Sequence, residues 1–512
     1  MSYDKRELAS ILQSLDFGSS IAEQDALLET ARVETSVFSD LLSDKVDLIP
    51  GTKGSGKSAL YRIFVDFLPE HLLKQRKVVI AHGVQRHGDD LFHAYKDEFE
   101  KMDENEFIDF WCVYLISLAK EHFIKNPLYA DFIQNCSNEI NTFYNSCRSA
   151  RIPDFEKQKS LHDVLGWTLS VIKSWGPKVK YRPPGESGEF EFSFFGEPSE
   201  TKVKSEKETE QPVLAQFAHT LKDSLESILK KAGLSLWLMI DRLDEIFPRR
   251  SKLETCALRG LLRTLRIFES REIRIKVFLR DDILEQVVSN AQGFTALTHI
   301  TARQADTLRW SEDQILNMIV KRLYAGDVFR KYLDVNSVRL AASRDYQEEA
   351  FYKVFPRTVF RGARQSSTLR WIYSHTSDGR GVVTPRDVID LLTKAKQKQQ
   401  DEYTDSSGES DFIIGPISIR YGHKELSKRK RTTFLEAEFP HLWKYIERFV
   451  GGKTQYSEDD IHKLFGKEWQ KVVDDLISIG VLGTEKSGRE GSKSFKIPFL
   501  YRAGLEVRQG SA

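Results

Sequence analysis

The stretch VDLIPGTKGSGKSALYRIFVDFL, residues 46–68, decides the fold that we expect for this chain. Residues 46–50 form a short apolar run that favours a β-strand, and the glycine-rich residues 51–58 follow it at once. Apolar residues after Ser58 recur at helical spacing, so the predicted order is strand, loop, helix. Further apolar strand patterns at 77–81, 234–240 and 273–279 alternate with helical segments. This alternation predicts an α/β fold with an open parallel sheet and a site along the carboxyl ends of its strands.

The loop matches the pattern G-x-x-x-x-G-K-[ST] at every fixed position. Its glycines allow backbone N–H groups to close around phosphate oxygens, and the following helix directs its positive end at the same anion. We expect Lys57 to reach the β and γ phosphates of ATP, and Ser58 to supply a ligand to Mg²⁺. The predicted cofactors are therefore ATP and Mg²⁺. The predicted nucleotide-binding residues are Gly51, Thr52, Lys53, Gly54, Ser55, Gly56, Lys57, Ser58 and Ala59.

The apolar strand at residues 234–240 ends in Asp241, in the sequence LWLMIDRLDE. This pattern resembles a Walker B strand, and Asp241 would then hold the magnesium ion through water. Glu245 or Asp244 follows at a position from which it can orient or deprotonate the attacking water. The alternative for Asp244 is a helix N-cap or a first-turn acid of the next segment.

Two arginines stand where they can reach a γ-phosphate. Arg280 ends the apolar strand in VFLRDDI, although Asp281 or Asp282 can simply pair with it. Arg386 follows Pro385 at the predicted start of a helix, where an exposed helix-start arginine is the alternative reading.

Composition describes an ordinary soluble protein of 512 residues, with 40% hydrophobic and 29% charged residues and a formal net charge of +1. The length favours about three domains. Four cysteines, Cys112, Cys136, Cys147 and Cys256, show no metal-ligand spacing, and we interpret them as reduced thiols. No signal peptide or membrane-spanning run is evident, so we expect a cytoplasmic protein with no membrane partner.

Together these segments resemble the AAA+/STAND side of the P-loop ATPases, with similarity to KAP-type and origin-recognition-type members over most of residues 17–395. The resemblance rests on GTKGSGKS, IDRLDE, KVFLRDDI, LRWSEDQILNMIVKRL and GRGVVTPRDVIDLL. It implies a sensor-1 role for Arg280 and a sensor-2 role for Arg386. Arg249, Arg250 and Arg303 are candidates for an arginine finger, with a solvated surface as the default for each.

The predicted domains are a P-loop ATPase core at 1–312, with N-terminal helices and a helical insertion at about 83–233, and a helical lid at 313–400. A linker at 401–431 and a winged-helix domain at 432–512 follow. Within the insertion, the aromatic segment FIDFWCVYLISLAKEHF is expected to pack in a core. The Pro, Gly, Ser, Glu and Lys-rich residues 181–212 indicate a surface insertion with partial disorder and a short hairpin.

The C-terminal segment looks like a winged helix, with helices at 457–465 and 468–479 and a wing at 482–497. The second helix is not basic, whereas the wing carries lysines and Arg489. The run Lys428-Arg429-Lys430-Arg431 is either a phosphate contact or a solvated linker face, and the solvated face is favoured. Winged helices bind DNA or protein, so either partner is open.

These observations predict an ATP-hydrolysing molecular switch that self-associates or controls a partner effector protein. A role in bacterial antiphage defence follows only by analogy with the resemblance. The alternatives are a DNA-binding ATPase of initiator or loader type, and a nucleotide-binding scaffold with negligible hydrolysis.

Overall fold

The computed structural model describes residues 3–68, 73, 75–83, 99–100, 102–149, 179–181, 190–192, 214–243, 251–288, 301–362, 364–486 and 493–508. By its internal contacts the chain divides into two compact units. The sheet unit comprises Val37–Gly51 and Leu60–Thr307. The helical unit comprises Met1–Ser36, Thr52–Ala59 and Leu308–Ala512.

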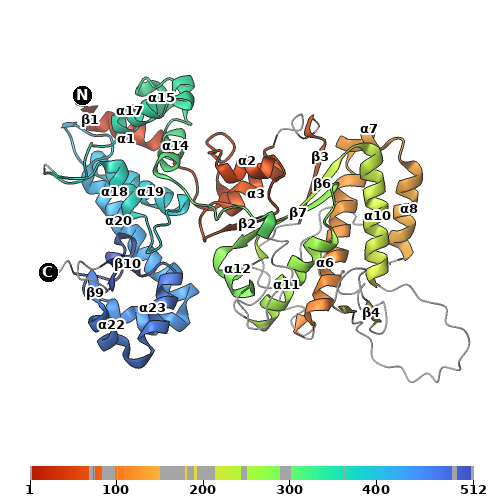
Figure 1. Ribbon diagram of the computed structural model, residues 1–512. Coiled ribbons are helices and arrows are strands. Elements are labelled where there is room, and N and C mark those ends of the chain that lie inside the picture. The colour runs from red at the N-terminus through yellow and green to blue at the C-terminus, as the bar shows by residue number, and fades with distance from the viewer. Residues whose placement is uncertain are drawn as a thin grey trace, which may run out of the picture. The chain divides into compact units, whose positions relative to one another are not determined.

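A four-stranded parallel sheet forms the centre of the sheet unit (Figure 1). Its strands are β2 (Leu48–Gly51), β3 (Val78–His82), β6 (Ser235–Ile240) and β7 (Ile273–Arg280), in the spatial order β2-β7-β6-β3. The structure confirms the α/β class and the predicted strands. Because all the strands run in one direction, the residues that follow β2, β6 and β7 lie along one edge of the sheet.

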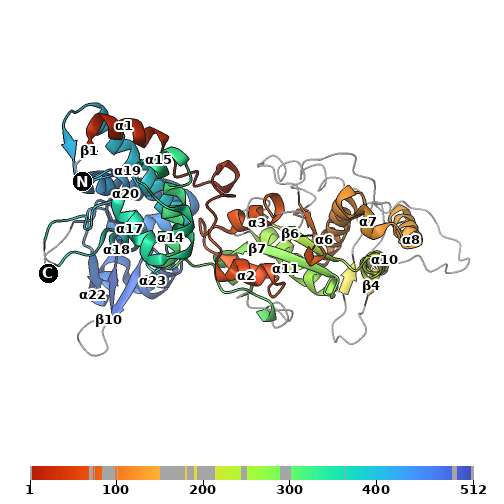
Figure 2. The same cartoon turned by 90° about the horizontal axis from the view of Figure 1, so that it is seen from above.

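Alternate residues of the central strands face opposite layers of helices. Leu236 and Leu238 belong to the core shared with helices α6, α10 and α11, whereas Trp237 lies against Phe64 of α3, which in turn packs on Phe38 of α2. Figures 1 and 2 show α2 and α3 on the other side of the sheet from α11. The helices of this unit are α2 (Ser36–Leu42), α3 (Lys57–Asp66), α6 (Glu104–Ala119), α7 (Ala130–Ile133), α8 (Ser137–Ser149), α10 (Leu214–Ala232), α11 (Lys252–Ile267) and α12 (Asp281–Val288).

Helix α6 contains most of the aromatic segment that was expected to pack in a core, and the structure confirms this. A capping box formed by Asp103 and Glu106 starts the helix, and residues 106–119 are all buried. Trp111 donates its indole N–H to the carbonyl of Ala257, 2.8 Å away, so even its polar atom is satisfied inside the core. A two-stranded hairpin, β4 (Val179–Tyr181) with β5 (Phe190–Phe192), also occurs in the region where a short hairpin was expected.

The helical unit contains the long antiparallel helices α19 (Pro385–Thr404) and α20 (Pro416–Lys430), with α1 (Lys5–Ser14) also packed on α19. The other helices of its middle region are α14 (Glu312–Leu323), α15 (Asp327–Tyr332), α16 (Ser337–Ala342), α17 (Arg344–Val354) and α18 (Thr368–His375). A small two-stranded sheet pairs β1 (Tyr3–Asp4) with β8 (Glu409–Ser410).

The C-terminal segment has helices α21 (Pro440–Ile446), α22 (Glu458–Phe465), α23 (Trp469–Ser478) and α24 (Phe499–Arg502). Strands β9 (Gln455–Ser457), β10 (Gly483–Lys486) and β11 (Lys493–Lys496) form an antiparallel sheet in the order β10-β11-β9. Both predicted helices are present, and β10 and β11 lie within the predicted wing.

Two predicted boundaries are wrong. Residues 401–431, expected as a linker, contain the end of α19 and all of α20. The polar sequence conceals this because Gln399 is buried and its side-chain oxygen accepts hydrogen bonds from Gly415 N and Ser418 Oγ, at 2.7 and 2.9 Å. Of the N-terminal helices expected in the core at 1–312, α1 belongs instead to the helical unit, since it packs on α19 and α15, whereas α2 belongs to the sheet unit.

No helix among the described residues has the length and apolar character that crossing a bilayer requires. All four cysteines are free thiols, and three of them are buried. This agrees with their interpretation as reduced residues.

Candidate nucleotide-binding site

The predicted phosphate loop connects β2 to α3, and its backbone depends on glycine at two positions. Gly54 has a φ of +84° and Gly56 a φ of +100°, in the region that side chains on L-residues disfavour. Helix α3 begins at Lys57, directly after these turns. The structure therefore confirms the predicted order of strand, loop and helix, with the amino end of the helix at the loop.

Polar groups of the loop are buried but incompletely satisfied. Thr52 is 7% exposed and Ser55 is fully buried, and neither hydroxyl has a hydrogen-bond partner within the described part of the chain. Burying an unsatisfied hydroxyl costs free energy. The Lys57 amine donates to the carbonyl of Thr52 at 2.9 Å, which folds the lysine back over the loop. Donors held in this way fit a ligand that is rich in acceptor oxygens, such as a polyphosphate.

Trp310 holds this loop from another part of the helical unit. Its indole N–H donates to the carbonyl of Ser55 at 2.7 Å, and its own carbonyl accepts from the Tyr373 hydroxyl at 3.0 Å. A side chain at Gly56 would meet the Trp310 ring at 3.7 Å. Sequence reasoning did not identify Trp310 as a site residue, because a tryptophan before a helix carries no signal for a contact more than 250 positions away.

Arg386 lies against the loop. The Thr384 side chain caps α19 and Pro385 occupies its first turn. A Cβ added to Gly54 would be 3.1 Å from Cβ of Arg386. The Arg386 Nε donates to the carbonyl of Ser20 at 3.2 Å. The structure thus brings Arg386 to the loop, whereas the simple reading of an exposed helix-start arginine does not account for this packing.

Lys53, which occupies a variable position of the loop, pairs with Glu438 of the C-terminal segment. The Glu438 side chain is 5% exposed and that of Lys53 is 36% exposed. Both line a cavity of about 280 Å³ that also includes Arg386 and Ser20. No sequence pattern predicts this pair, since the partners are 385 positions apart.

Asp241 and Arg280 belong to the sheet unit. Asp241 directly follows β6, and Arg280 ends β7 in register with Gly51, the last residue of β2. Both residues therefore lie at the carboxyl edge of the sheet, where the site was predicted. The pKa of Tyr61, on α3, is raised well above its usual value by burial and by the nearby Asp241.

Arg280 forms an ion pair with a neighbouring acid, which was the alternative to a sensor role. Its guanidinium bonds both carboxylate oxygens of Asp282, at 2.9 and 2.8 Å, and only 7% of the residue is exposed. Glu245, Asp244, Arg249 and Arg250 lie outside the described residues. Their predicted roles stay predictions.

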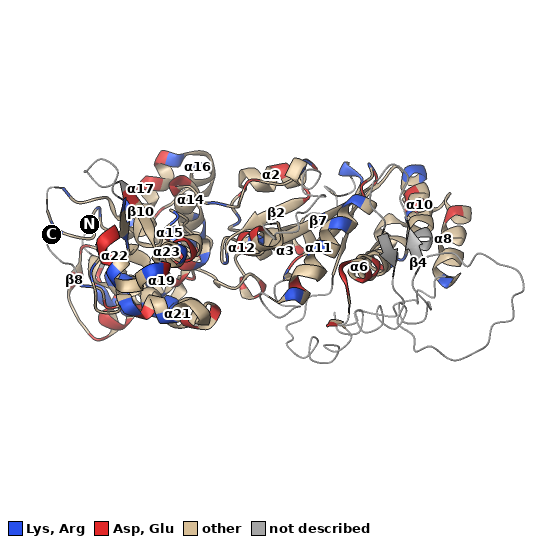
Figure 3. Cartoon of the chain, turned by 60° about the horizontal axis from the view of Figure 1, so that its bottom comes forward, with Lys and Arg blue, Asp and Glu red and all other residues tan. Residues whose placement is uncertain are grey.

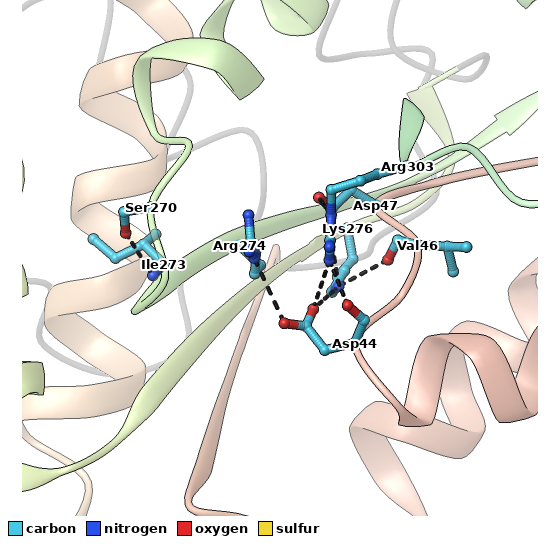
Figure 4. A network of polar contacts seen from close by, with 8 residues as sticks. All are labelled: Asp44, Val46, Asp47, Ser270, Ile273, Arg274, Lys276 and Arg303. Carbon is cyan, nitrogen blue, oxygen red and sulfur yellow. Dashed lines mark hydrogen bonds and ion pairs between the residues drawn. The ribbon is translucent and has the colours of Figure 1, made fainter. Parts of the chain in front are cut away.

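Arg303 is not placed as a free arginine finger (Figure 4). Its Nε bonds Asp47 at 2.5 Å, and its Nη2 bonds the carbonyl of Asp44 at 2.5 Å. Lys276 of β7, fully buried, bonds the carboxylates of Asp44 and Asp47 at 2.5 and 2.7 Å. Asp47 precedes β2, so this network lies at the amino end of the strand, opposite the end from which the phosphate loop leaves.

The basic run at the end of α20 is neither a bare linker face nor an open phosphate contact. Lys430 pairs with Asp387 at 2.8 Å and Arg429 with Asp390 at 3.2 Å, both acids on α19. Lys428 and Arg431 pair with Glu425 and Glu436, each at 2.9 Å. These four cations therefore form ion pairs within the helical unit.

No model of a protein family and no curated protein matches the chain. Among solved structures, it is similar to the ORC2 protein of Aeropyrum pernix in its ADPNP–ADP complexes, with 13% identity, a TM-score of 0.42 and coverage of 93% of each chain. It is also similar to a Walker-type ATPase of Pyrococcus abyssi, with 10% identity, a TM-score of 0.38, and coverage of 92% of this chain and 95% of that one. Because both TM-scores are below 0.5, we base the function on the residues of this chain alone.

Proposed function

We propose that the protein is an ATP-binding and ATP-hydrolysing P-loop switch. The observation that carries this proposal is the loop at 51–58, where two glycines have positive φ and two buried hydroxyls, of Thr52 and Ser55, have no partner within the described residues. A loop that served only as a structural turn would satisfy these hydroxyls or expose them.

In this proposal the backbone N–H groups of the loop and the Lys57 amine hold the β and γ phosphates. Ser58 and Asp241 would hold Mg²⁺, which would neutralise charge on the β and γ phosphates. Glu245, or Asp244, orients the water that attacks the γ-phosphorus, while Arg386, packed against Gly54, stabilises the charge on the transferred group. Arg280 would act as a sensor only after exchanging Asp282 for the nucleotide.

The proposal that the nucleotide acts as a switch rests on contacts between the loop and the rest of the helical unit. Trp310, Arg386 and Glu438 all touch the loop, so phosphate binding changes the surroundings of three separate elements. We propose that the C-terminal segment is a winged helix whose position depends on the nucleotide. Antiphage defence and an effector partner rest on the family resemblance alone, and isolation of the protein with its partners from its host tests them.

Phosphate release tests the proposed enzyme. Wild type, Lys57→Ala and Glu245→Gln are compared with ATP and Mg²⁺, with and without DNA. We expect Lys57→Ala to abolish both binding and release, and Glu245→Gln to bind ATP while release falls by about 100-fold or more. If the wild type binds ATP but releases no more phosphate than Lys57→Ala, the protein is a nucleotide-binding scaffold. Stimulation by DNA would favour the initiator or loader alternative.

A further inference from the structure

A second candidate site lies on the helical unit, in the loop between α17 and α18. From Phe351 to Ser377 the chain has five lysines and arginines and no aspartate or glutamate. Elsewhere acidic and basic side chains are interspersed along the helices, for example on α10 and α22 (Figure 3). The local excess of positive charge is concealed by the formal net charge of +1 for the whole chain.

The base of this loop is held by the fold, although its tip is exposed. Thr358 forms an antiparallel bridge with Ser367. Thr368, fully buried, donates its N–H to the carbonyl of Arg357 at 2.9 Å and its hydroxyl to that of Pro356 at 2.6 Å. Val359 is also buried. The side chains of the tip are therefore presented from an anchored base.

Helix α20 adds a matching row of side chains. Arg420, Tyr421 and Lys424 are exposed at helical spacing i, i+1 and i+4. The Arg420 guanidinium lies 5.0 Å from the ring centroid of Phe360, which joins the loop to the helix. Phe360 and Tyr421 are 42% and 40% exposed, which is unusual for rings of this size. We call this surface the basic–aromatic patch, formed by Arg357, Phe360, Arg361, Arg364, Arg420, Tyr421 and Lys424.

The cations of the patch differ from their neighbours in having no acidic partner. Within the described residues, no carboxylate forms an ion pair with Arg361, Arg364, Arg420 or Lys424. By contrast, Lys428, Arg429 and Lys430 of the same helix, and Arg431 directly after it, each pair with an acid. Arg357 lies over the ring of Tyr352, 4.4 Å from its centroid. Unpaired guanidinium groups beside exposed rings are the combination that phosphates and unstacked bases require.

We propose that the basic–aromatic patch binds single-stranded nucleic acid, with the arginines on the phosphates and Phe360 and Tyr421 stacked on bases. A duplex offers phosphates but keeps its bases stacked, so it can use only the cationic part of the patch. An acidic protein would use the charges but has no planar bases for the rings. This proposal does not depend on ATP binding, and it concerns a surface separate from the predicted wing.

Fluorescence anisotropy of the full chain with labelled oligothymidine and oligouridine, each about 20 nucleotides long, tests the proposal. Comparison of the two distinguishes DNA from RNA, and a duplex of the same length measures the contribution of charge alone. We expect Arg361→Glu/Arg364→Glu/Arg420→Glu to weaken binding at least about 30-fold and to lower the salt slope by about 2. Phe360→Ala/Tyr421→Ala should weaken single-strand binding about 10-fold and duplex binding less than about 2-fold.

The matched control is Lys463→Glu/Lys467→Glu/Lys471→Glu, which makes the same change in charge at exposed residues near α22 and α23. It should bind like the wild type. Thermal unfolding of each variant shows whether it is folded, and the uncharged ring variant preserves the test if the triple reversal is not. The proposal is overturned if the wild type binds no single strand, if it prefers polyglutamate, or if the control loses as much affinity as the patch variant.

Discussion

Gly54 combines a positive φ with close packing against two neighbours in space, Arg386 and Thr384. Its backbone φ is +84°, and Cβ and Cδ of Arg386 and Oγ1 of Thr384 all lie within 3.3 Å of the position that a Cβ would occupy. Backbone conformation and the approach of Arg386 therefore depend on the same missing side chain.

Gly54→Ala is predicted to weaken ATP binding by about 10-fold or more, because about 1 kcal/mol of backbone strain adds to displacement of Arg386. Titration with a fluorescent ATP analogue measures the effect. The control is Gly381→Ala, where φ is +77° and nothing lies within 4 Å of the added Cβ. The control should share the strain and keep its affinity within about twofold. Equal affinity of Gly54→Ala and the wild type would contradict this account of the loop.

Lys53 of the phosphate loop pairs with Glu438, and in our proposal this carboxylate would compete with the phosphates of ATP for the lysine. Glu438→Gln removes the negative charge and keeps the shape, so we expect ATP affinity to rise by about 3- to 10-fold at low salt and by less at high salt, since Lys53 is partly exposed. Calorimetric titration at two salt concentrations measures it. Glu436→Gln is the control, because Glu436 pairs with Arg431. An unchanged or lower affinity of Glu438→Gln would show that the ion pair does not oppose binding.

Helices α18, α20 and α24 are joined by a stack of rings centred on His375. Its ring lies 3.8 Å from that of Trp371 and 4.1 Å from that of Phe499, and His423 follows at 5.1 Å. Burial lowers the pKa of His375 to about 3 and that of His423 to about 4. The folded protein therefore holds both rings neutral.

Since both pKa values are about 6.5 in the unfolded chain, the unfolded state binds more protons between about pH 6.5 and 4. The contribution of these two histidines to the free energy of unfolding is therefore constant above this pH range and decreases as the pH falls through it. His375→Phe keeps an aromatic ring and removes one titrating group, so its melting temperature should decrease less between about pH 7 and pH 5 than that of the wild type. Parallel pH profiles for the two proteins would rule out this role of His375.

Strand β7 is fixed at the amino end of β2 by the buried Lys276. Lys276→Met keeps an unbranched side chain of similar length but leaves Asp44 and Asp47 without this cation. The free energy of unfolding should therefore decrease by about 3 kcal/mol. Chemical denaturation measures it. Lys45→Met is the control, because Lys45 pairs with Asp40 at 3.4 Å and its side chain is 69% exposed, and it should cost less than about 0.5 kcal/mol. Similar losses in the two variants would contradict a buried, coupled network.

At the scale of the whole chain, features set by residues close in sequence could be predicted, whereas contacts between distant segments could not. The strand, loop and helix around Lys57 were predictable because the glycines and apolar spacing act within a few residues. The partners of that loop were not, because Trp310 and Glu438 come from distant segments. Helix α20 was also missed, since the burial of the polar Gln399 of α19 depends on hydrogen bonds from Gly415 and Ser418, which the sequence pattern does not reveal. Arg303 was misjudged because its acidic partners, Asp47 and Asp44, are 256 and 259 positions away in the sequence.

The phosphate loop and the elements that flank it in the sequence are assigned to different units. Thr52–Ala59 belongs to the helical unit, whereas the strand that precedes it and most of the helix that follows it belong to the sheet unit, as does Asp241. In our proposal Lys57 of the loop binds ATP and Asp241 would hold its Mg²⁺.

Calorimetric titration of ATP into the full chain, with Mg²⁺ and with a chelator, tests this central claim most directly. We predict one site per chain in the wild type, no detectable binding by Lys57→Ala, and loss of the Mg²⁺-dependent part alone in Asp241→Asn, which should match the wild type in chelator. Binding by Lys57→Ala equal to that of the wild type, or an Mg²⁺ effect unchanged in Asp241→Asn, would contradict it.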